Sequence, residues 1–307
     1  MKKNPLSEKA KSATVAGVTL THPDKVLYPE AGLTKKDLAH YYKSIAAWIL
    51  PHLRDRPLTL VRCPQGREQE CFYQKHANDI SARHVNRITV QHDGEPATYM
   101  TVNSLPAIID LVRLDVLELH TWGSRCDRLD RPDRMVFDLD PGTGVDWQQV
   151  IEAAKMIRDY LAAVTLVSFV KTTGGKGLHV VVPLLRRNTW AEVKSFSKII
   201  AENMAQTMPE RFTSSITKAR RTGKIFVDYL RNDEEATAIA AYSPRARPGA
   251  PVSTPVSWGE LNAVPGSDHY TLVTLLKRLK TLKKDPWNGF GAARQTLTRA
   301  MIDNLRL

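Results

Sequence analysis

The chain has 307 residues, of which 42% are hydrophobic and 25% are charged. This composition is typical of a globular protein with a sizeable core. No run of 18 apolar residues occurs and the N-terminus lacks the apolar segment of a signal peptide, so we expect a soluble intracellular protein. Lysine and arginine number 44 against 32 acidic residues, a net charge of +12. This surplus predicts a polyanionic partner, nucleic acid above all, with merely solubilising charge as the alternative.

The three cysteines, Cys63, Cys71 and Cys126, form no CxxC pair. Their odd count and irregular spacing favour reduced thiols over disulfides or a zinc site.

The first 12 residues are polar and basic without periodicity, which predicts a disordered tail or the remnant of a linker. Thr34 then begins a capping-box pattern, followed by apolar residues at helical spacing that we expect to end at Pro51. Lys25 and Lys35 lie near this helix N-terminus, where backbone N–H groups favour an anion. The alternative is that both are solvated surface lysines.

Residues 57–104 change to strand patterns at 58–61, 72–73, 88–90 and 98–102, with Asp93-Gly94 as a hairpin signal. Phe72 and Tyr73 stand beside basic residues, a combination that stacks bases next to phosphates. Strand alternation predicts that one of the two rings faces the core and the other is free. A short helix at 105–113 and a strand at 117–122 follow.

The stretch from Met135 to Pro141 runs from apolar residues into two carboxylates and a Pro-Gly turn, which predicts a buried strand that ends there. Asp138 and Asp140 would project from the same face, because side chains two apart on a strand share a side. Carboxylates that close repel one another unless a cation lies between them, so the pattern indicates a divalent metal site. Ordinary turn chemistry is the alternative.

Asp146 caps the next predicted helix, and strands at 166–171 and 178–183 then enclose a glycine-rich turn. Such a turn exposes backbone N–H groups to phosphate oxygens, and the side chains of Thr172, Thr173, Lys176 and His179 surround it. It is not a Walker A loop, because a strand follows it. A plain hairpin remains the alternative.

The last part of the chain reads as a helix at 191–208, a basic loop at 218–224 and a strand at 225–232 that carries Asp228. A strand at 239–242 and helices near 268–284 and 294–306 follow. Asp228 repeats the pattern of a carboxylate at the end of an apolar strand. Two-metal nucleotidyl transfer needs carboxylates for two divalent ions and cationic groups for the departing pyrophosphate, and the chain has candidates for both.

The sequence resembles the archaeo-eukaryotic primase superfamily, and within it the polymerase domain of bacterial ligase D, the multifunctional enzyme of non-homologous end joining. Seven ordered motifs over nearly the whole chain carry the resemblance: residues 22–29, 71–75, 118–123, 136–141, 171–180, 224–229 and 241–245.

The resemblance implies roles for individual residues. Asp138 and Asp140 look like the ligands shared by both metals, and Asp228 like the third carboxylate near the primer hydroxyl. The residues implied to lie around the nucleotide are Thr172, Thr173, Lys176, His179, Arg231, Arg245 and His120. Lys25 with Lys35, joined by His22, corresponds to the family's pocket for a DNA 5′-phosphate, and Phe72 to its base-stacking aromatic.

The implied fold is α/β (α+β), an antiparallel RRM-like sheet with flanking helices and a smaller N-terminal lobe. We expect residues 13–307 to form one primase-polymerase domain, with the lobe at about 13–130, the catalytic core at about 131–260 and C-terminal helices at about 261–307.

The implied activity is the addition of nucleotides, ribonucleotides by preference, to DNA 3′ ends and into gaps during double-strand-break repair. Two divalent ions, Mn²⁺ in preference to Mg²⁺, and a nucleoside triphosphate would serve it. Gapped or broken DNA with a 5′-phosphate, ligase and nuclease modules of the same enzyme, and Ku are the implied partners, in the cytoplasm at the bacterial nucleoid and away from membranes.

Neither a KxDG ligase motif nor a nuclease-like His and Asp cluster is evident in the sequence, so we expect this chain to polymerise without sealing or trimming. Two other functions stay open from sequence. A metal-dependent glycosyltransferase also uses Asp-X-Asp, and a non-catalytic primase-like module would bind DNA through the same basic surface.

Overall fold

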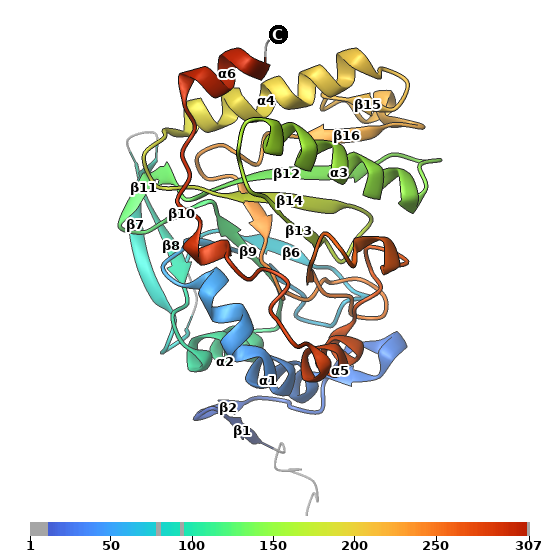
Figure 1. Ribbon diagram of the computed structural model, residues 1–307. Coiled ribbons are helices and arrows are strands. Elements are labelled where there is room, and N and C mark those ends of the chain that lie inside the picture. The colour runs from blue at the N-terminus through green and yellow to red at the C-terminus, as the bar shows by residue number, and fades with distance from the viewer. Residues whose placement is uncertain (1–11, 78–80, 93–94, 306–307) are drawn as a thin grey trace, which may run out of the picture.

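The computed structural model describes residues 12–77, 81–92 and 95–305. Two antiparallel-rich sheets lie face to face, and helices cover the outer face of each (Figure 1). We name them the β12 sheet, with strand order β15-β16-β12-β14-β13-β18, and the β9 sheet, with order β17-β9-β5-β8-β7 and β6 paired to β5. A mixed α/β fold with antiparallel sheets and flanking helices was predicted, and it is confirmed.

In the β12 sheet only the β15–β16 pair is parallel. Helices α3 and α4 pack on its outer face. Its elements are β12 (Arg134–Pro141), β13 (Phe169–Thr172), β14 (Leu178–Pro183), β15 (Phe212–Thr213), β16 (Ile225–Asp228), β18 (Pro255–Val256), α3 (Trp147–Ala163) and α4 (Trp190–Thr207).

In the β9 sheet, helices α1 and α2 lie on the outer face, with α5 against α1. Its elements are β5 (Leu58–Arg62), β6 (Phe72–Gln74), β7 (Asn86–His92), β8 (Glu95–Thr101), β9 (Val116–Trp122), β17 (Thr237–Ile239), α1 (Lys35–Leu53), α2 (Leu105–Arg113) and α5 (Leu272–Thr281). The remaining elements are β1 (Ala13–Val15), β2 (Val18–Leu20), β3 (Val26–Tyr28), β4 (Leu33–Thr34), β10 (Ser124–Arg125), β11 (Arg128–Pro132), α6 (Arg299–Leu305) and short 3-10 turns at Pro29–Ala31, Lys218–Arg221, Leu261–Ala263 and Phe290–Ala292.

Strand alternation decides which side chains reach the space between the sheets. Met135 and Phe137 point toward α3 and α4 and belong to the core beneath those helices. Val136, between them, packs into the core of the β9 sheet. Successive side chains on a strand point to opposite faces, so Asp138 and Asp140 share the face of Val136. Both carboxylates therefore project toward the space between the sheets.

Local signals set several helix starts. Thr34 accepts a hydrogen bond from the Asp37 backbone N–H and completes the predicted capping box of α1. Asp146 does the same for α3. Pro51 does not end α1, which continues to Leu53; a proline in the last turn removes only one backbone hydrogen bond there. The predicted Asp93-Gly94 turn and most of the predicted 1–12 tail lie outside the described residues.

The division into lobe, core and C-terminal helices stays a prediction. One observation bears on its boundaries: β17, from the range expected to form the core, pairs with β9 of the N-terminal sheet. None of the helices in the described ranges is long and apolar enough to cross a membrane.

Cys63 and Cys71 form a disulfide, so the expectation of reduced thiols at these two positions is wrong. The strands β5 and β6 pair antiparallel with Arg62 opposite Phe72. The next residues outward, 63 and 71, therefore face each other across the hairpin. Their spacing in the sequence does not reveal this pairing, because it depends on where the chain reverses. Cys126 is a free thiol.

Both aromatic rings of β6 are exposed, Phe72 by 42% and Tyr73 by 67%, so the prediction that one of them faces the core is wrong. The reason is that β6 is a short edge strand, paired only to β5 in the part of the chain that the structure describes, so neither of its faces is covered. The guanidinium of Arg62 lies 5.5 Å from the centre of the Phe72 ring.

Candidate active site

Three neighbouring strands place three titratable side chains in a row. Asp138 on β12 stands opposite His179 on β14 and opposite Asp228 on β16. Directly paired residues of antiparallel strands lie about 5 Å apart at their Cα atoms. Asp138 is thus inside its strand rather than at the end, and sheet register brings together residues 41 and 90 positions away in the sequence.

Basic side chains hold these carboxylates. Arg231 Nε lies 3.3 Å from Oδ2 of Asp138 and 3.2 Å from Oδ2 of Asp228. Arg221 Nη1 donates a 3.3 Å hydrogen bond to Asp140 Oδ2. With the arginines in these positions, no group of three or more His, Cys, Asp or Glu residues within the described ranges is arranged to hold a metal ion.

Burial and neighbouring charges shift the pKa values of these groups in different directions. Burial raises the pKa of Asp140, and the Asp138 carboxylate raises it further. Burial likewise raises the pKa of Asp228, against the opposing effect of Arg231. Burial alone would raise the pKa of Asp138, but its contacts with His179 and Arg231 hold it well below its usual range. Burial and Lys171 lower the pKa of His179 to about 4.

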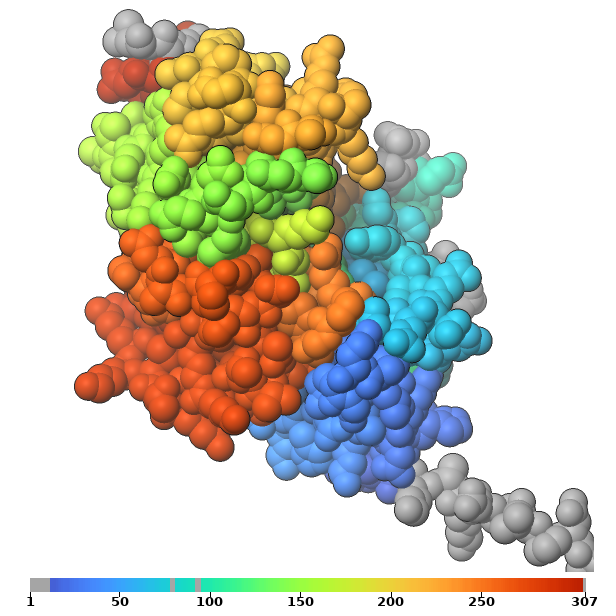
Figure 2. Space-filling model, turned by 90° about the vertical axis from the view of Figure 1, so that its right-hand side faces the viewer, coloured from blue at the N-terminus to red at the C-terminus, as the bar shows by residue number. Residues whose placement is uncertain are grey.

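A cleft of about 510 Å³ opens over this row. Of the side chains predicted from sequence, it is lined by Asp138, Asp140, Thr173, Lys176, His179, Arg231, Arg245 and His120. Figure 2 shows the hollow between segments coloured cyan, yellow-green and orange, from three distant parts of the chain. Asp228 is 8% exposed and lies behind Arg231 rather than in the cleft wall.

The glycine-rich turn has a fixed shape. The backbone N–H groups of Gly175 and Gly177 both donate to the hydroxyl of Thr173. Gly174 has φ +66°, a conformation that favours glycine, and a Cβ on Gly177 would lie 1.9 Å from the Leu139 carbonyl oxygen. Only glycine permits this close approach to β12. Lys176 extends from the turn into the cleft.

Residues 34–287 match the family model described as LigD, primase-polymerase domain. The chain belongs to the LigD primase-polymerase family. It is 40% identical over 293 residues to the multifunctional non-homologous end joining protein LigD of Pseudomonas aeruginosa, which covers 95% of this chain and 35% of that protein. It is 38% identical over 259 residues to LigD of Mycobacterium tuberculosis, covering 82% of this chain and 34% of that protein.

The chain therefore spans about a third of the length of these curated relatives. Among solved structures it is similar to the polymerase domain of Mycobacterium tuberculosis ligase D in complex with DNA, with a TM-score of 0.81 and 34% identity. That match covers 90% of this chain and 98% of the other. As a LigD primase-polymerase domain the chain is a nucleotidyltransferase of the archaeo-eukaryotic primase superfamily, and membership implies use of a divalent metal and nucleoside triphosphates.

Thr172, the neighbour of Thr173, does not reach the cleft of this LigD-type domain. It is fully buried, and its hydroxyl donates to the Val252 carbonyl while accepting from the Thr254 backbone N–H. The predicted contact of Thr172 with nucleotide is corrected accordingly: strand alternation turns this side chain into the core.

Glu118 was missed as a site residue by sequence reasoning, although it lies two residues before His120. Its carboxylate is 2.8 Å from His120 Nε2 and accepts a 3.0 Å hydrogen bond from Arg245 Nε and one from the Ala246 backbone N–H. Burial would raise the pKa of Glu118, but these partners lower it to about 2. The Glu118 carboxylate therefore holds two residues predicted to bind nucleotide, His120 and Arg245. Arg247, Lys75 and Thr59 also line the cleft without having been predicted.

The two lysines predicted to bind a 5′-phosphate do lie close together, but both contact a carboxylate, that of Asp115. Lys25 Nζ lies 3.0 Å and Lys35 Nζ 2.7 Å from the two oxygens of Asp115. Lys35 is only 2% exposed and Lys25 is partly exposed, so Lys25 is the lysine open to an outside anion. The exposed His22 has φ +52° and accepts the Lys25 backbone N–H at its carbonyl. Asp115 was not singled out from the sequence.

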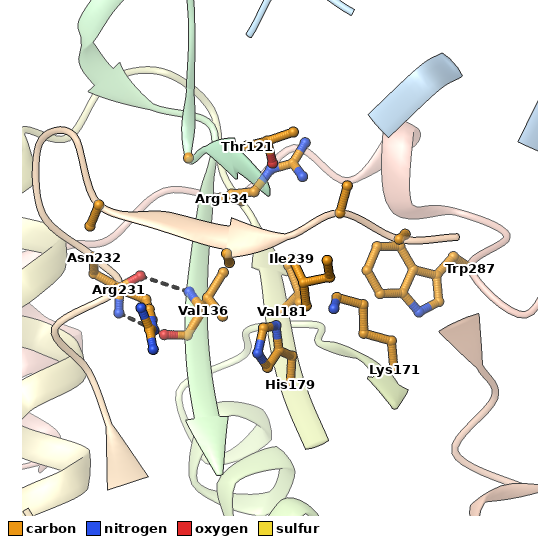
Figure 3. Close-up of a pocket in the computed structure, with 15 residues that line it drawn as sticks. Thr121, Arg134, Val136, Lys171, His179, Val181, Arg231, Asn232, Ile239 and Trp287 are labelled. Atoms are coloured by element: carbon orange, nitrogen blue, oxygen red, sulfur yellow. Dashed lines mark hydrogen bonds between the residues drawn. The ribbon is translucent and has the colours of Figure 1, made fainter. Parts of the chain in front are cut away.

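A small cavity of about 20 Å³ continues the site between the sheets (Figure 3). It has room for about one water molecule. The view shows Lys171 between His179 and Trp287, with Val136 and Asn232 joined by hydrogen bonds on the other side. Lys171 is 3% exposed and donates to the Ser253 hydroxyl. Burial lowers the pKa of this ammonium well below its ordinary value.

Proposed function

We propose that this domain adds nucleotides to DNA 3′ ends and into gaps by metal-dependent nucleotidyl transfer in double-strand-break repair. The observation that carries the proposal is the row of Asp228, Asp138 and His179 on three paired strands, of which Asp138 and His179 line a basic cleft. The cleft has the size of a small-molecule site.

Cationic residues of the cleft would bind the phosphates of the nucleotide, and exposed aromatic residues would contact the DNA. Lys176, which the glycine-rich turn presents to the cleft, would hold phosphate oxygens, assisted by Arg245 and Arg247. Arg245 is positioned for this by Glu118 and by a hydrogen bond that it donates to the Thr173 carbonyl. The exposed rings of Phe72 and of Tyr73, which lines the cleft, would stack on bases of the DNA.

The carboxylates fit a divalent ion. Asp140 and Asp228 both have a raised pKa in part because Asp138 is negative, and carboxylate oxygen is the ligand that Mg²⁺ and Mn²⁺ accept. Asp138, Asp140 and Asp228 would hold two such ions once Arg231 and Arg221 move to the triphosphate. The ions would activate the primer 3′-hydroxyl and neutralise the phosphates. A preference for Mn²⁺ over Mg²⁺ and for ribonucleotides is part of this proposal.

On the DNA side, Lys25 with Lys35 and His22 would bind the 5′-phosphate at a gap or break, displacing the Lys25–Asp115 ion pair. Ligase and nuclease modules joined to this domain, and Ku, are proposed partners at the bacterial nucleoid in the cytoplasm. The printed names of the relatives support this setting, since they are non-homologous end joining proteins.

Primer extension on a gapped duplex with Mn²⁺ and labelled nucleotide tests the proposal. Asp138→Asn should reduce incorporation by at least 10³-fold, as expected when a metal carboxylate is lost, while binding to the gapped DNA is retained. Asp130→Asn, which alters an aspartate whose side chain is 66% exposed, is the matched control and should extend normally. Normal extension by the Asp138 variant would overturn the metal assignment.

The same assay also tests the two alternative functions that the sequence left open. A glycosyltransferase would consume a nucleotide sugar without extending the primer, and a non-catalytic module would bind the gap without incorporation. Family membership with LigD primase-polymerase domains argues against both.

A further inference from the structure

A second cavity, of about 430 Å³, lies at the opposite end of β12 from the carboxylates. Its walls come from the last turns of α1, from the start of β12, from residues 183–186 and from the segment 285–294, red in Figure 1. The rise of a strand puts Arg134 about 13 Å from Asp138 along β12. The cavity shares no lining residue with the catalytic cleft.

Positive charge is in excess around this cavity. Five arginines and two aspartates, Asp133 and Asp285, line it. Asp133 pairs with three guanidiniums, those of Arg56, Arg125 and Arg134. Arg56 is fully buried, and the side chains of Arg134 and Arg125 are 11% and 35% exposed. Arg294 also lines the cavity and, among the residues that the structure describes, donates to two carbonyl oxygens and to no carboxylate. Uncompensated charge in a partly buried place is costly, so the cavity favours an anion.

Several donors there lack an acceptor. Arg125 and Arg134 each donate to Asp133 through Nε. Their Nη atoms donate to no acceptor in the described ranges, and neither does the buried Nε of Arg56. Burial and the nearby Arg56 also lower the pKa of Arg134 to about 9, a sign of the same crowding of cations. Guanidinium forks with free Nη atoms match the oxygens of a phosphate.

Aromatic rings line the same cavity. Trp287 and Phe290 stack with centroids 4.7 Å apart, and the Arg134 guanidinium lies 5.7 Å from the centre of the Phe290 ring. Trp48 and His52 of α1 complete this wall. Rings beside guanidiniums are the combination that holds a base next to a phosphate. The volume lies within the range of small-molecule sites.

We infer that this cavity binds a nucleotide with a terminal phosphomonoester, its phosphate at Arg125, Arg134 and Arg294 and its base against the aromatic wall. The nucleotide can be free or the phosphorylated end of a strand, since the recognised chemistry is shared. The inference is independent of the polymerase proposal, because the site lies outside the cleft.

Calorimetric titration with adenosine 5′-monophosphate tests it, in EDTA so that metal-dependent binding in the cleft is suppressed. The cavity variant is the double substitution Arg125→Gln with Arg294→Gln. The single substitution Arg294→Gln is also tested, because it leaves the ion pair between Arg125 and Asp133 intact. Arg158→Gln is the matched control, because that side chain is 37% exposed on the distant helix α3. Lys176→Ala removes a cation of the cleft instead.

We expect wild type, Arg158→Gln and Lys176→Ala to bind the nucleotide alike. The double variant should bind at least tenfold more weakly, and the single variant should lie between. Adenosine, which has no phosphate, should also bind at least tenfold more weakly. Hydrogen exchange should show protection of residues 285–294.

The inference would be overturned if neither the monophosphate nor a 5′-phosphorylated strand bound wild type at 285–294, or if the folded cavity variants bound equally well. Loss of binding in Lys176→Ala instead would place the nucleotide in the cleft and overturn it too. A 5′-phosphorylated oligothymidylate run in parallel distinguishes the sources: a strand end is indicated if only it protects 285–294, and a free nucleotide if only the monophosphate does.

Discussion

Asp138 has a different kind of neighbour on each adjoining strand, the imidazole of His179 on one side and the carboxylate of Asp228 on the other. At the residue scale this asymmetry sets the chemistry of the site. Arg231 now bridges the two aspartates, while burial raises the pKa of Asp228 against the opposing effect of Arg231. The adjacent threonines, Thr172 and Thr173, show that one step along a strand changes a side chain from core to cleft.

Substitution of Thr172 should affect stability and not nucleotide binding, and substitution of Thr173 should affect nucleotide binding. Thr172→Val should destabilise the fold by about 1–3 kcal/mol, because its buried hydroxyl partners at Val252 and Thr254 lose their hydrogen bonds, while the KM for nucleotide is unchanged. Thr173→Val should raise that KM, because the hydroxyl orders the glycine-rich turn, and Thr173→Ser should restore it. Urea unfolding and steady-state extension kinetics measure both. An unchanged KM in Thr173→Val would contradict the role of the turn.

At the element scale, helix α1 connects two distant functions. Its first residue, Lys35, belongs to the corner with Lys25 and Asp115, and its last turn carries His52 into the wall of the second cavity. A capping box fixes where the helix begins, so the position of Lys35 follows from local sequence. The position of His52 relative to Trp287 follows only from packing, with ring centres 5.3 Å apart.

For the phosphate corner, Lys25→Ala should weaken binding to a 5′-phosphorylated gap by about 1–3 kcal/mol, as for a lost charge-assisted contact, and leave binding to a hydroxyl end nearly unchanged. Lys43→Ala, on an exposed face of α1, is the control. Fluorescence anisotropy with both DNA ends measures the difference. Equal losses on the two ends would mean that Lys25 acts only through general electrostatics.

His52 makes stability depend on pH. Burial, with Arg134 and Arg56, lowers its pKa in the folded state to about 3, whereas an unfolded histidine titrates near 6.5. As pH falls below about 6.5 the unfolded chain takes up the proton first, so the free energy of unfolding decreases until about pH 3.

The loss in the free energy of unfolding between pH 7 and 5 should be smaller by about 2 kcal/mol in His52→Gln than in wild type. His40→Gln, an exposed position on the same helix, should behave like wild type. Urea titrations at the two pH values measure these changes. An equal loss in His52→Gln and wild type would show that folding does not lower the pKa of this imidazole.

At the scale of the whole molecule, the net charge of +12 is spread over a protein whose two sheets enclose the site. DNA affinity should fall linearly on a plot of log K against log salt concentration, with a slope near −0.9 for each phosphate contacted. Lys25→Ala should reduce the steepness by about 1, and Asp130→Asn should not reduce it. Anisotropy titrations from low to moderate salt give the slopes, and a flat plot would contradict nucleic acid as the partner of the charge.

The sequence by itself determined the strands that carry Asp138, Asp140, His179 and Asp228, because apolar alternation and turn residues act over a few positions. It also determined the capped helix starts and, through ordered motifs, the family. Tertiary structure decided what meets across the sheets: the Asp138–Asp228 register, the corner at Asp115, the Cys63–Cys71 disulfide and the inward turn of Thr172. These contacts join residues far apart in the chain, and register and packing, which no local pattern encodes, select them.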